Sequence, residues 1–322
     1  MKILITGSAG FIGFNFSKFL LEKTNFTIVG IDNLNDYYSV KVKVKRLKLL
    51  KKYKKFSFIK INIVDKKKLN FLFKKKFDAV FNFAAQAGVR YSLENPRSYI
   101  ENNILGFYNI IEASINHKVQ KLFYASSSSV YGDSKKFPLK ETDVINPKNI
   151  YGLTKKINEE ISSLLSNNKK ISIIGLRFFT VFGEWGRPDM LIFKYLRSCF
   201  NKKEKFYLNN FGNHTRDFTY IHDVNKTLFN LLKNKRSIGH IVLNVCSNKP
   251  VKITKILEMI KKNVNKKSAK ITQRKFQLAD VIKTHGNNSK VKKLSKISKF
   301  TNLDDAIKNT VNWYNKNWKI YN

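Results

Sequence analysis

The residues best suited to chemistry are a tyrosine and a lysine in the segment NPKNIYGLTKKINEE, residues 146–160. Tyr151 and Lys155 are four positions apart, so on a helix they lie on the same face, one turn from each other. A free tyrosine has a pKa of about 10, and a neighbouring ammonium lowers this pKa because it favours the phenolate. The pair could therefore act as acid and base on a substrate hydroxyl.

Spacing alone does not distinguish this pair, because the chain contains 62 Lys and Arg residues and 14 Tyr. The same spacing joins Tyr37 to Lys41 and Tyr131 to Lys135. Tyr37 precedes a basic segment that predicts a surface helix, and Tyr131 follows a serine run in a predicted loop. Neither pair has surroundings that indicate a site.

The surroundings of Tyr151 are different. The segment KLFYASSSS predicts a strand that carries serines to its carboxyl end, and Ser127 stands 24 residues before Tyr151 at the start of a long predicted helix. Open α/β proteins bind ligands at the carboxyl ends of their strands. We therefore expect Ser127, Tyr151 and Lys155 to meet in one site.

A glycine-rich turn near the N-terminus indicates a dinucleotide site. The segment KILIT predicts a strand, and TGSAGFIG then places Gly7, Gly10 and Gly13 at the start of an apolar helix. Such glycines allow a tight turn, a close approach to a pyrophosphate and close packing of helix on strand, and the helix N-terminus favours the anion. Asp32 ends the next predicted strand, where a carboxylate can bind a ribose 2′-hydroxyl, and Asn33 rather than Arg follows it. The pattern predicts NAD rather than NADP.

The elements that must position these residues alternate between strand and helix as far as residue 182. This alternation predicts the fold class α/β, with a doubly wound, mostly parallel Rossmann sheet. Beyond residue 182 the alternation breaks, although HIVLNVCS still has the composition of a core strand. We predict a Rossmann domain at 1–182, to which segment 217–247 returns, and a smaller C-terminal α/β substrate domain at 183–322.

Composition restricts the class of protein. The net charge of +40 arises from Lys far more than from Arg and accompanies abundant Asn, Ile and Phe. We attribute it to A/T-rich codons acting on exposed faces, and because specific readout of nucleic acid favours Arg, we predict no specific nucleic-acid partner. No apolar run reaches the roughly 18 residues of a membrane span, and no signal peptide is evident, so we expect a cytoplasmic protein without a membrane partner. The histidines and the two cysteines show no ligand spacing, and we predict no metal site.

Several segments together resemble a known family. TGSAGFIG, ASSSSVYG and YGLTK resemble the motifs of the extended short-chain dehydrogenase/reductase family. DNLNDYY, AAQAGVRYSLENPRSYIENN, GLRFFTVFGEWGRPDM, RDFTYIHD and QLADV narrow the resemblance to UDP-glucuronate 4-epimerases within the NAD-dependent epimerase/dehydratase group. Phe182, Glu184 and His222 depart from the more usual Tyr, Pro and Asp.

The resemblance implies an isomerase that interconverts UDP-glucuronate and UDP-galacturonate by oxidation and reduction at C4 with tightly bound NAD, in polysaccharide biosynthesis. Tyr151 would be the base, Lys155 would support it, and Ser127 would bind the same sugar oxygen. A homodimer through paired helices is also implied. The implied NAD contacts are Gly7, Gly10, Phe11, Ile12, Gly13, Asp32, Asn33, Asn62, Ile63, Ala84, Asn102, Tyr151, Lys155 and Phe179. The implied contacts to the UDP-sugar are Arg90, Ser128, Ser129, Thr180, Arg187, Arg216 and Asp280.

Other functions stay open. A 4-epimerase of a neutral UDP-hexose, such as UDP-glucose or UDP-N-acetylglucosamine, would share the fold, although GRPDM and NDYY favour the uronate. A non-catalytic NAD-binding or nucleic-acid-binding protein would not need Ser127, Tyr151 and Lys155. Related dehydratases and decarboxylases have an acid beside this serine, whereas here its neighbours are Ser126 and Ser128. An epimerase fits the sequence better.

Overall fold

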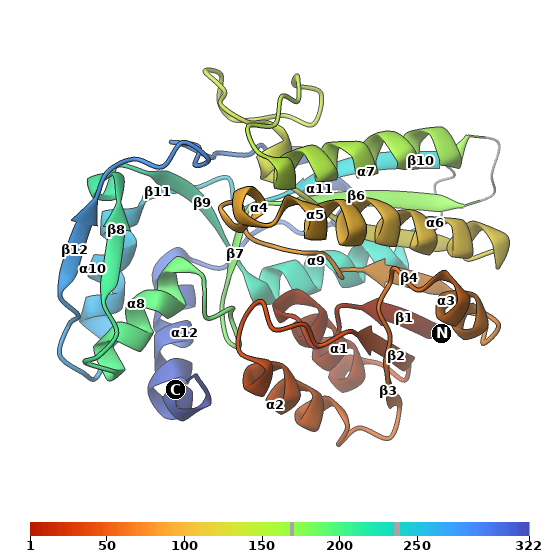
Figure 1. Ribbon diagram of the computed structural model, residues 1–322, viewed down its shortest axis with the longest axis horizontal. Coiled ribbons are helices and arrows are strands. Elements are labelled where there is room, and N and C mark those ends of the chain that lie inside the picture. The colour runs from red at the N-terminus through yellow and green to blue at the C-terminus, as the bar shows by residue number, and fades with distance from the viewer. Residues whose placement is uncertain (168–170, 235–238, 322) are drawn as a thin grey trace.

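A computed structural model describes residues 1–167, 171–234 and 239–321. Its centre is a seven-stranded sheet in which every neighbouring pair of strands is parallel (Figure 1). In sheet order the strands are β10 (Gly239–Val245), β6 (Ser172–Phe178), β5 (Lys121–Ser127), β4 (Ala79–Asn82), β1 (Lys2–Thr6), β2 (Thr27–Asp32) and β3 (Phe56–Lys60). The chain starts in the middle, runs outward to β3, and then crosses to β4 on the other side of β1. This reversal opens a crevice at the carboxyl ends of the strands, and it confirms the predicted fold class.

Two layers of helices cover the sheet, and the alternation of side chains along β1 explains why. Ile3 and Ile5 face one hydrophobic cluster, whereas Leu4 faces the other. The first cluster is completed by α1 (Phe11–Lys23), α2 (Val40–Leu50) and α9 (Ile221–Lys233). The second is completed by α3 (Lys66–Phe73), α6 (Gly106–Asn116) and α7 (Ile150–Ser166). Both faces of the parallel sheet are therefore buried.

The segment before α6 is not a regular α-helix. Two short helices, α4 (Tyr91–Glu94) and α5 (Pro96–Tyr99), lead into a π-helical segment, η1 (Ile100–Leu105). Within η1 the buried amide of Asn103 bonds the backbone N–H and carbonyl of Gln86 at 2.7 and 3.0 Å. Apolar periodicity cannot reveal this departure because it depends on a loop distant in the chain.

A second region follows β6 and contains two small sheets. One is formed by β11 (Pro250–Lys252), β9 (Thr215–Tyr220) and β7 (Thr180–Phe182), and the other by β12 (Ile271–Arg274) and β8 (Phe206–Asn209). Helices α8 (Leu191–Phe200), α10 (Ile253–Asn263) and α12 (Leu303–Asn317) pack with them, whereas α11 (Ser289–Ser295) packs against α9 and β10. Of segment 217–247, β9 pairs in a small sheet, whereas α9 and β10 pack with the main sheet. The division into two domains at residue 182 stays a prediction.

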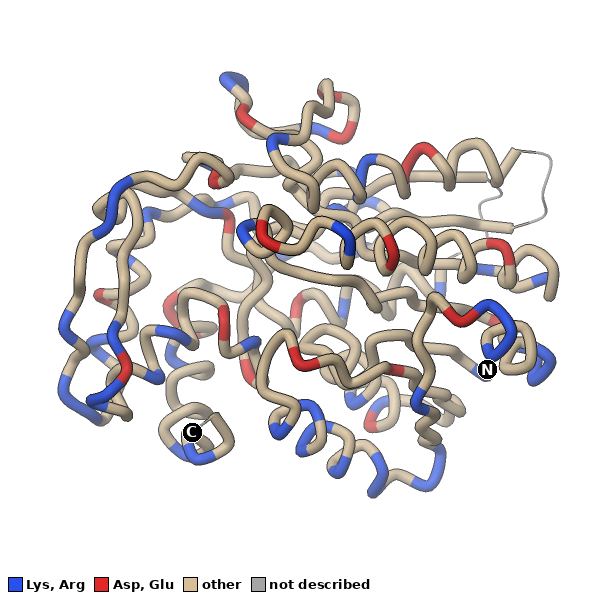
Figure 2. The backbone as a smooth tube through the Cα atoms, viewed as in Figure 1, with Lys and Arg blue, Asp and Glu red and all other residues tan. Residues whose placement is uncertain are grey.

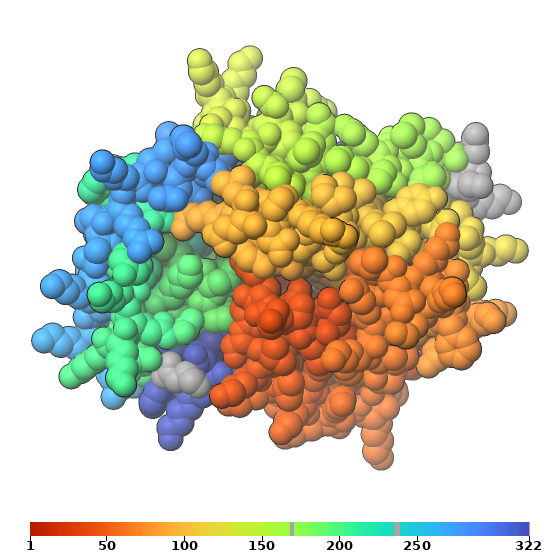
Figure 3. Space-filling model, in the orientation of Figure 1, coloured from red at the N-terminus to blue at the C-terminus, as the bar shows by residue number. Residues whose placement is uncertain are grey.

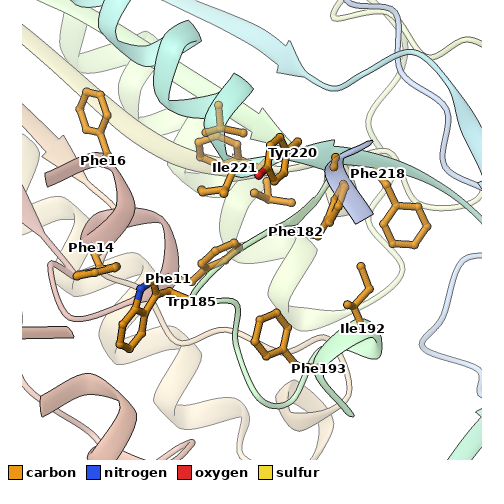
Figure 4. Packing of buried hydrophobic residues seen from close by; sticks show 14 of the residues in the cluster. Phe11, Phe14, Phe16, Phe182, Trp185, Ile192, Phe193, Phe218, Tyr220 and Ile221 are labelled. Carbon is orange, nitrogen blue, oxygen red and sulfur yellow. The ribbon is translucent and has the colours of Figure 1, made fainter. Parts of the chain in front are cut away.

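An aromatic cluster joins the two regions (Figure 4). The ring of Phe14 on α1 packs edge-on against Trp185, with centroids 5.2 Å apart, and Trp185 also contacts Trp313 of α12. In the space-filling view the N-terminal elements and the C-terminal elements occupy opposite sides of the molecule (Figure 3). The cluster therefore fixes the walls of the crevice relative to each other.

The surface is basic in both regions. Lys and Arg recur along α2 and along the elements of the C-terminal region (Figure 2). Among the residues that the structure describes, no helix is long and apolar enough to cross a membrane.

Candidate active site

A cleft of about 410 Å³ opens at the carboxyl ends of the central strands. Its lining brings together residues from the N-terminal turn, the serine run, the start of α7 and the C-terminal region. It includes every residue that we predicted to contact NAD, namely Gly7, Gly10, Phe11, Ile12, Gly13, Asp32, Asn33, Asn62, Ile63, Ala84, Asn102, Tyr151, Lys155 and Phe179. It also includes Ser127 and the predicted substrate contacts Ser128, Ser129, Thr180, Arg187, Arg216 and Asp280.

The glycine turn requires glycine at each of its three positions. Gly7 has φ of +65°, and a Cβ there would lie 2.8 Å from the amide nitrogen of Ala84. A Cβ on Gly13 would overlap the carbonyl oxygen of Gly7, and one on Gly10 would lie 2.9 Å from the same oxygen. The three glycines thus bring the turn, the start of α1 and the segment after β4 closer together than side chains allow.

The residues around this turn fit a dinucleotide. Gly10 supplies no side-chain cap to α1, and the first turn of α1 has no acidic residue. The unpaired amides of that turn therefore remain available to a pyrophosphate. The Asp32 carboxylate lies beside the turn, where it accepts the N–H of Ala9 at 3.1 Å and that of Leu34 at 2.8 Å. These bonds hold it at the position expected for binding a ribose hydroxyl.

Helix α7 positions the tyrosine and the lysine. Asn149 caps the helix, because its side-chain oxygen accepts the N–H of Gly152 at 2.8 Å. Tyr151 consequently lies in the first turn, and Lys155 follows one turn later on the same face. The ammonium of Lys155 is 5.8 Å from the centroid of the Tyr151 ring.

Burial controls the electrostatics of this pair. Burial raises the pKa of Tyr151, while a hydrogen bond with Ser127 and the positive charge of Arg187 lower it. Burial also lowers the pKa of Lys155 to about 8. In the described parts of the chain no carboxylate forms an ion pair with Lys155, so its positive charge is free to act on the phenol and on bound ligands.

The serine run ends β5 at the edge of the cleft. The Ser127 hydroxyl lies 3.2 Å from the Ser129 hydroxyl and accepts the N–H of Ser129 at 3.1 Å. The buried Ser126 hydroxyl donates to Glu159 at 2.5 Å, and Glu159 is neutralised by a buried ion pair with Arg177. The carboxylates among the described lining residues are Asp32 and Asp280. Neither belongs to the serine run.

The opposite wall is built from charged pairs. Arg90 does not line the cleft, but its guanidinium forms an ion pair with Asp280 at 2.6 Å. Arg216 lines the cleft and donates to the backbone carbonyls of Val281 and Ile282 at 2.6 and 2.9 Å. Burial lowers the pKa of Arg216 to about 10, although Asp280 acts in the other direction. This wall can receive an anionic ligand.

The two other Tyr–Lys pairs have different surroundings. Tyr131 is buried, where its hydroxyl accepts from Arg177 at 2.8 Å and donates to Asn244 at 2.7 Å, whereas Lys135 is exposed. Tyr37 lines the cleft and donates to Asp189 at 3.2 Å. Our sequence reasoning missed this position of Tyr37 because its hydroxyl partner lies 152 residues further along the chain. The NDYY segment in the family resemblance was the available signal.

No group of three or more His, Cys, Asp or Glu side chains that could hold a metal ion occurs within residues 1–167, 171–234 and 239–321. Cys199 and Cys246 are both buried and unpaired.

A Rossmann sheet, a glycine turn and the Tyr–Lys pair are typical of the short-chain dehydrogenase/reductase class of proteins. Comparison with known proteins identifies the family. The model of the NAD-dependent epimerase/dehydratase family matches residues 3–246. The chain belongs to this family.

Individual relatives narrow the similarity. The chain is 39% identical to a UDP-glucuronate 4-epimerase of Thermodesulfobacterium geofontis, over 98% of this chain and 97% of that protein. It is 39% identical to protein CapI of Staphylococcus aureus, over 99% of this chain and the whole of that protein. Among solved structures, UDP-glucuronic acid 4-epimerase from Bacillus cereus, in complex with UDP-glucuronic acid and NAD, superposes with a TM-score of 0.91. It is 30% identical and covers 98% of this chain and 99% of its own.

Proposed function

We propose that the protein is an NAD-dependent enzyme that interconverts UDP-glucuronate and UDP-galacturonate by epimerisation at C4. The observation that carries this proposal is the meeting of Ser127, Tyr151 and Lys155 in one cleft with the glycine turn. The similarity to a UDP-glucuronate 4-epimerase over nearly the whole chain supports the choice of substrate.

In the proposed reaction Tyr151 takes the proton of the sugar 4′-hydroxyl and later returns it. The hydroxyl of Ser127 bonds the same sugar oxygen and holds it against the phenol. Lys155 stabilises the phenolate, because a nearby positive charge favours the ionised form of tyrosine. When bound, NAD supplies the hydride chemistry, accepting hydride from C4′ and returning it to the opposite face of the keto sugar.

The proposed chemistry stops at epimerisation because the cleft has no acid beside Ser127. Elimination or protonation of a carbanion needs a proton donor at that position, and Ser128 and Ser129 occupy it instead. A 4-keto uronate is a β-keto acid that loses CO₂ when its carboxylate turns out of the ketone plane. We propose that Ser128, Ser129 and Thr180, which line the cleft, hold the carboxylate in place.

A neutral UDP-hexose is the second candidate substrate. The structure of MoeE5 in complex with UDP-glucose and NAD is 26% identical and superposes with a TM-score of 0.86, and MoeE5 has also been solved with UDP-glucuronic acid. We favour the uronate because the relative that is similar over nearly the whole chain is a UDP-glucuronate 4-epimerase.

The decisive experiment incubates the purified protein separately with UDP-glucuronate, UDP-glucose and UDP-N-acetylglucosamine and separates the products. We expect UDP-galacturonate from the first and little turnover of the other two. Faster epimerisation of UDP-glucose would select the neutral substrate. Release of a UDP-pentose and CO₂ would show decarboxylation and contradict the proposal.

We also propose a homodimer, which would form through α6 and α7. These neighbouring helices expose apolar side chains, among them Tyr108, Leu153 and Leu164, and Leu164 is 72% exposed. A second copy of the chain would bury the exposed apolar side chains of both helices in a four-helix contact. We expect the pair of substitutions Leu153→Glu and Leu164→Glu to yield a monomer in light scattering. A wild-type monomer at micromolar concentration would contradict this proposal.

The cytoplasmic location stays a prediction.

A further inference from the structure

Tyr37 lines the cleft, but the proposed epimerase reaction gives it no role. Tyr37 lies in the loop between β2 and α2, and its ring packs against that of Tyr91 with centroids 5.0 Å apart. Gly88 lies directly under the hydroxyl, with φ of +104°, and a Cβ there would overlap the hydroxyl oxygen. The Gly88 loop therefore leaves room for the Tyr37 side chain to reach across the cleft.

The Tyr37 hydroxyl meets a charged pair on the opposite wall. It donates to the Oδ2 atom of Asp189 at 3.2 Å. The same carboxylate accepts two bonds from Arg187, one from Nε to Oδ1 at 3.0 Å and one from Nη2 to Oδ2 at 2.5 Å. Asp189 thus uses both oxygens to orient the Arg187 guanidinium, and Tyr37 fixes one of these oxygens.

The ring of Tyr37 provides a second constraint. The guanidinium carbon of Arg187 lies 5.8 Å from the centroid of this ring, within the range of a cation–π contact. In the described parts of the chain the Nη1 group of Arg187 has no protein acceptor. Arg187 is therefore held from two sides, with one donor group free, in the lining of the cleft.

We propose that Tyr37 is a positioning residue that holds Arg187 toward an anionic group of the substrate, an inference that rests on the proposed UDP-sugar substrate. The ligand chemistry is a phosphate or a carboxylate, and the UDP-sugar supplies both. Tyr37 acts through Asp189 and through its ring, without touching the reacting atoms.

A double-mutant cycle on substrate binding tests this role. Calorimetry gives the Kd of UDP-glucuronate for the NAD-loaded wild type, Tyr37→Phe, Arg187→Ala and the double variant. We expect Tyr37→Phe to weaken binding by about tenfold in the wild-type background and by less than about twofold in the Arg187→Ala background, because coupled residues are not additive. Equal losses in both backgrounds, or no loss in either, would overturn the proposal.

A second ligand and a matched variant sharpen the result. If Tyr37→Phe also weakens the binding of UDP-glucose, Arg187 binds the diphosphate. If it weakens only the binding of UDP-glucuronate, Arg187 binds the carboxylate. Both outcomes support the role of Tyr37. Tyr91→Phe removes a neighbouring hydroxyl whose one hydrogen bond within the described residues is accepted from the Asn95 amide at 3.3 Å, and this variant should bind like the wild type. If the wild type turns over no UDP-sugar, the proposed function fails, whereas the binding cycle still tests Tyr37.

Discussion

The two sides of the cleft are built by different means. On the cofactor side, the backbone shapes the site: three glycines form the turn, the first turn of α1 has no side-chain cap, and the Asp32 carboxylate is held by two N–H groups. On the substrate side, charged side chains pair with one another, as Arg90 does with Asp280 and Arg187 with Asp189. The first side therefore depends on backbone geometry. The second consists of groups that can exchange partners, which suits a sugar that must turn within the site.

The largest expected effect lies where the two sides meet. Tyr151→Phe removes the proton acceptor but leaves the glycine turn and the charged wall intact. We expect the turnover number to fall by about a thousandfold, within the range for loss of general acid–base catalysis, while the protein retains NAD. Turnover is measured with UDP-glucuronate, and NAD is quantified after denaturation.

Two of the other tyrosines serve as controls for this prediction. Tyr37→Phe should lose at most about tenfold in kcat/KM, because it acts indirectly. Tyr131→Phe should lose stability rather than turnover, since its hydroxyl bonds buried Arg177 and Asn244. A Tyr37→Phe variant as inactive as Tyr151→Phe would contradict the assignment of the base.

The contrast between the two sides also explains what the sequence could predict. The cofactor side depends on TGSAGFIG and on the end of the next strand, so local pattern was sufficient to find Gly7, Gly13 and Asp32. The pair Tyr151 and Lys155 shares its spacing with two other pairs, and it was recognisable because a serine-bearing strand precedes it and a long predicted helix contains it. The bond from Tyr37 to Asp189 and the ion pair from Arg90 to Asp280 span 152 and 190 residues. Such contacts depend on tertiary packing, and they cannot be predicted from the spacing of residues along the chain.

Gly13→Ala should damage the cofactor side alone. The added Cβ would overlap the Gly7 carbonyl oxygen, so the turn must open. We expect NAD affinity to fall by at least about tenfold and the free energy of unfolding to fall by about 1–3 kcal/mol, as for overpacking elsewhere. UDP should still bind in calorimetry.

Gly239→Ala is the matched control for Gly13→Ala. A Cβ at Gly239 would meet nothing within 4 Å, although φ there is +99°. This variant should lose stability through backbone strain without losing NAD. If both variants lost NAD equally, general instability rather than the turn would be the cause.

Lys155 stands between the two sides and should reduce stability while it supports turnover. Burial lowers its pKa to about 8 in the folded protein, against about 10.4 for a free lysine. Between these values the unfolded chain binds more protons than the folded chain, so the free energy of unfolding rises with pH across this window. The full effect is about 3 kcal/mol. Below pH 8 the buried ammonium destabilises the folded protein by this full amount.

Urea unfolding of NAD-free protein at pH 7.5, 9 and 10.5 measures this effect. Relative to the wild type, Lys155→Met should be more stable by about 3 kcal/mol at pH 7.5 and lose this advantage by pH 10.5, although it is nearly inactive. Lys48→Met, on the exposed face of α2, should show no such dependence. A constant difference between wild type and Lys155→Met across the three pH values would mean that the ammonium is not desolvated.

The smallest expected effect concerns the rim of the substrate side. Arg90→Ala breaks the ion pair with Asp280, but the Arg90 side chain is 47% exposed, and exposed pairs contribute little. We expect the affinity for UDP to change by about two- to fivefold, as is usual for peripheral charges, with NAD affinity unchanged. Arg97→Ala, in the same part of the chain and paired with Glu101, should change neither. A loss of NAD in Arg90→Ala would show that the two sides of the cleft are coupled through this rim. An unchanged NAD affinity with weakened UDP binding would instead mean that the charged wall can be altered one pair at a time while the backbone-built side stays as it is.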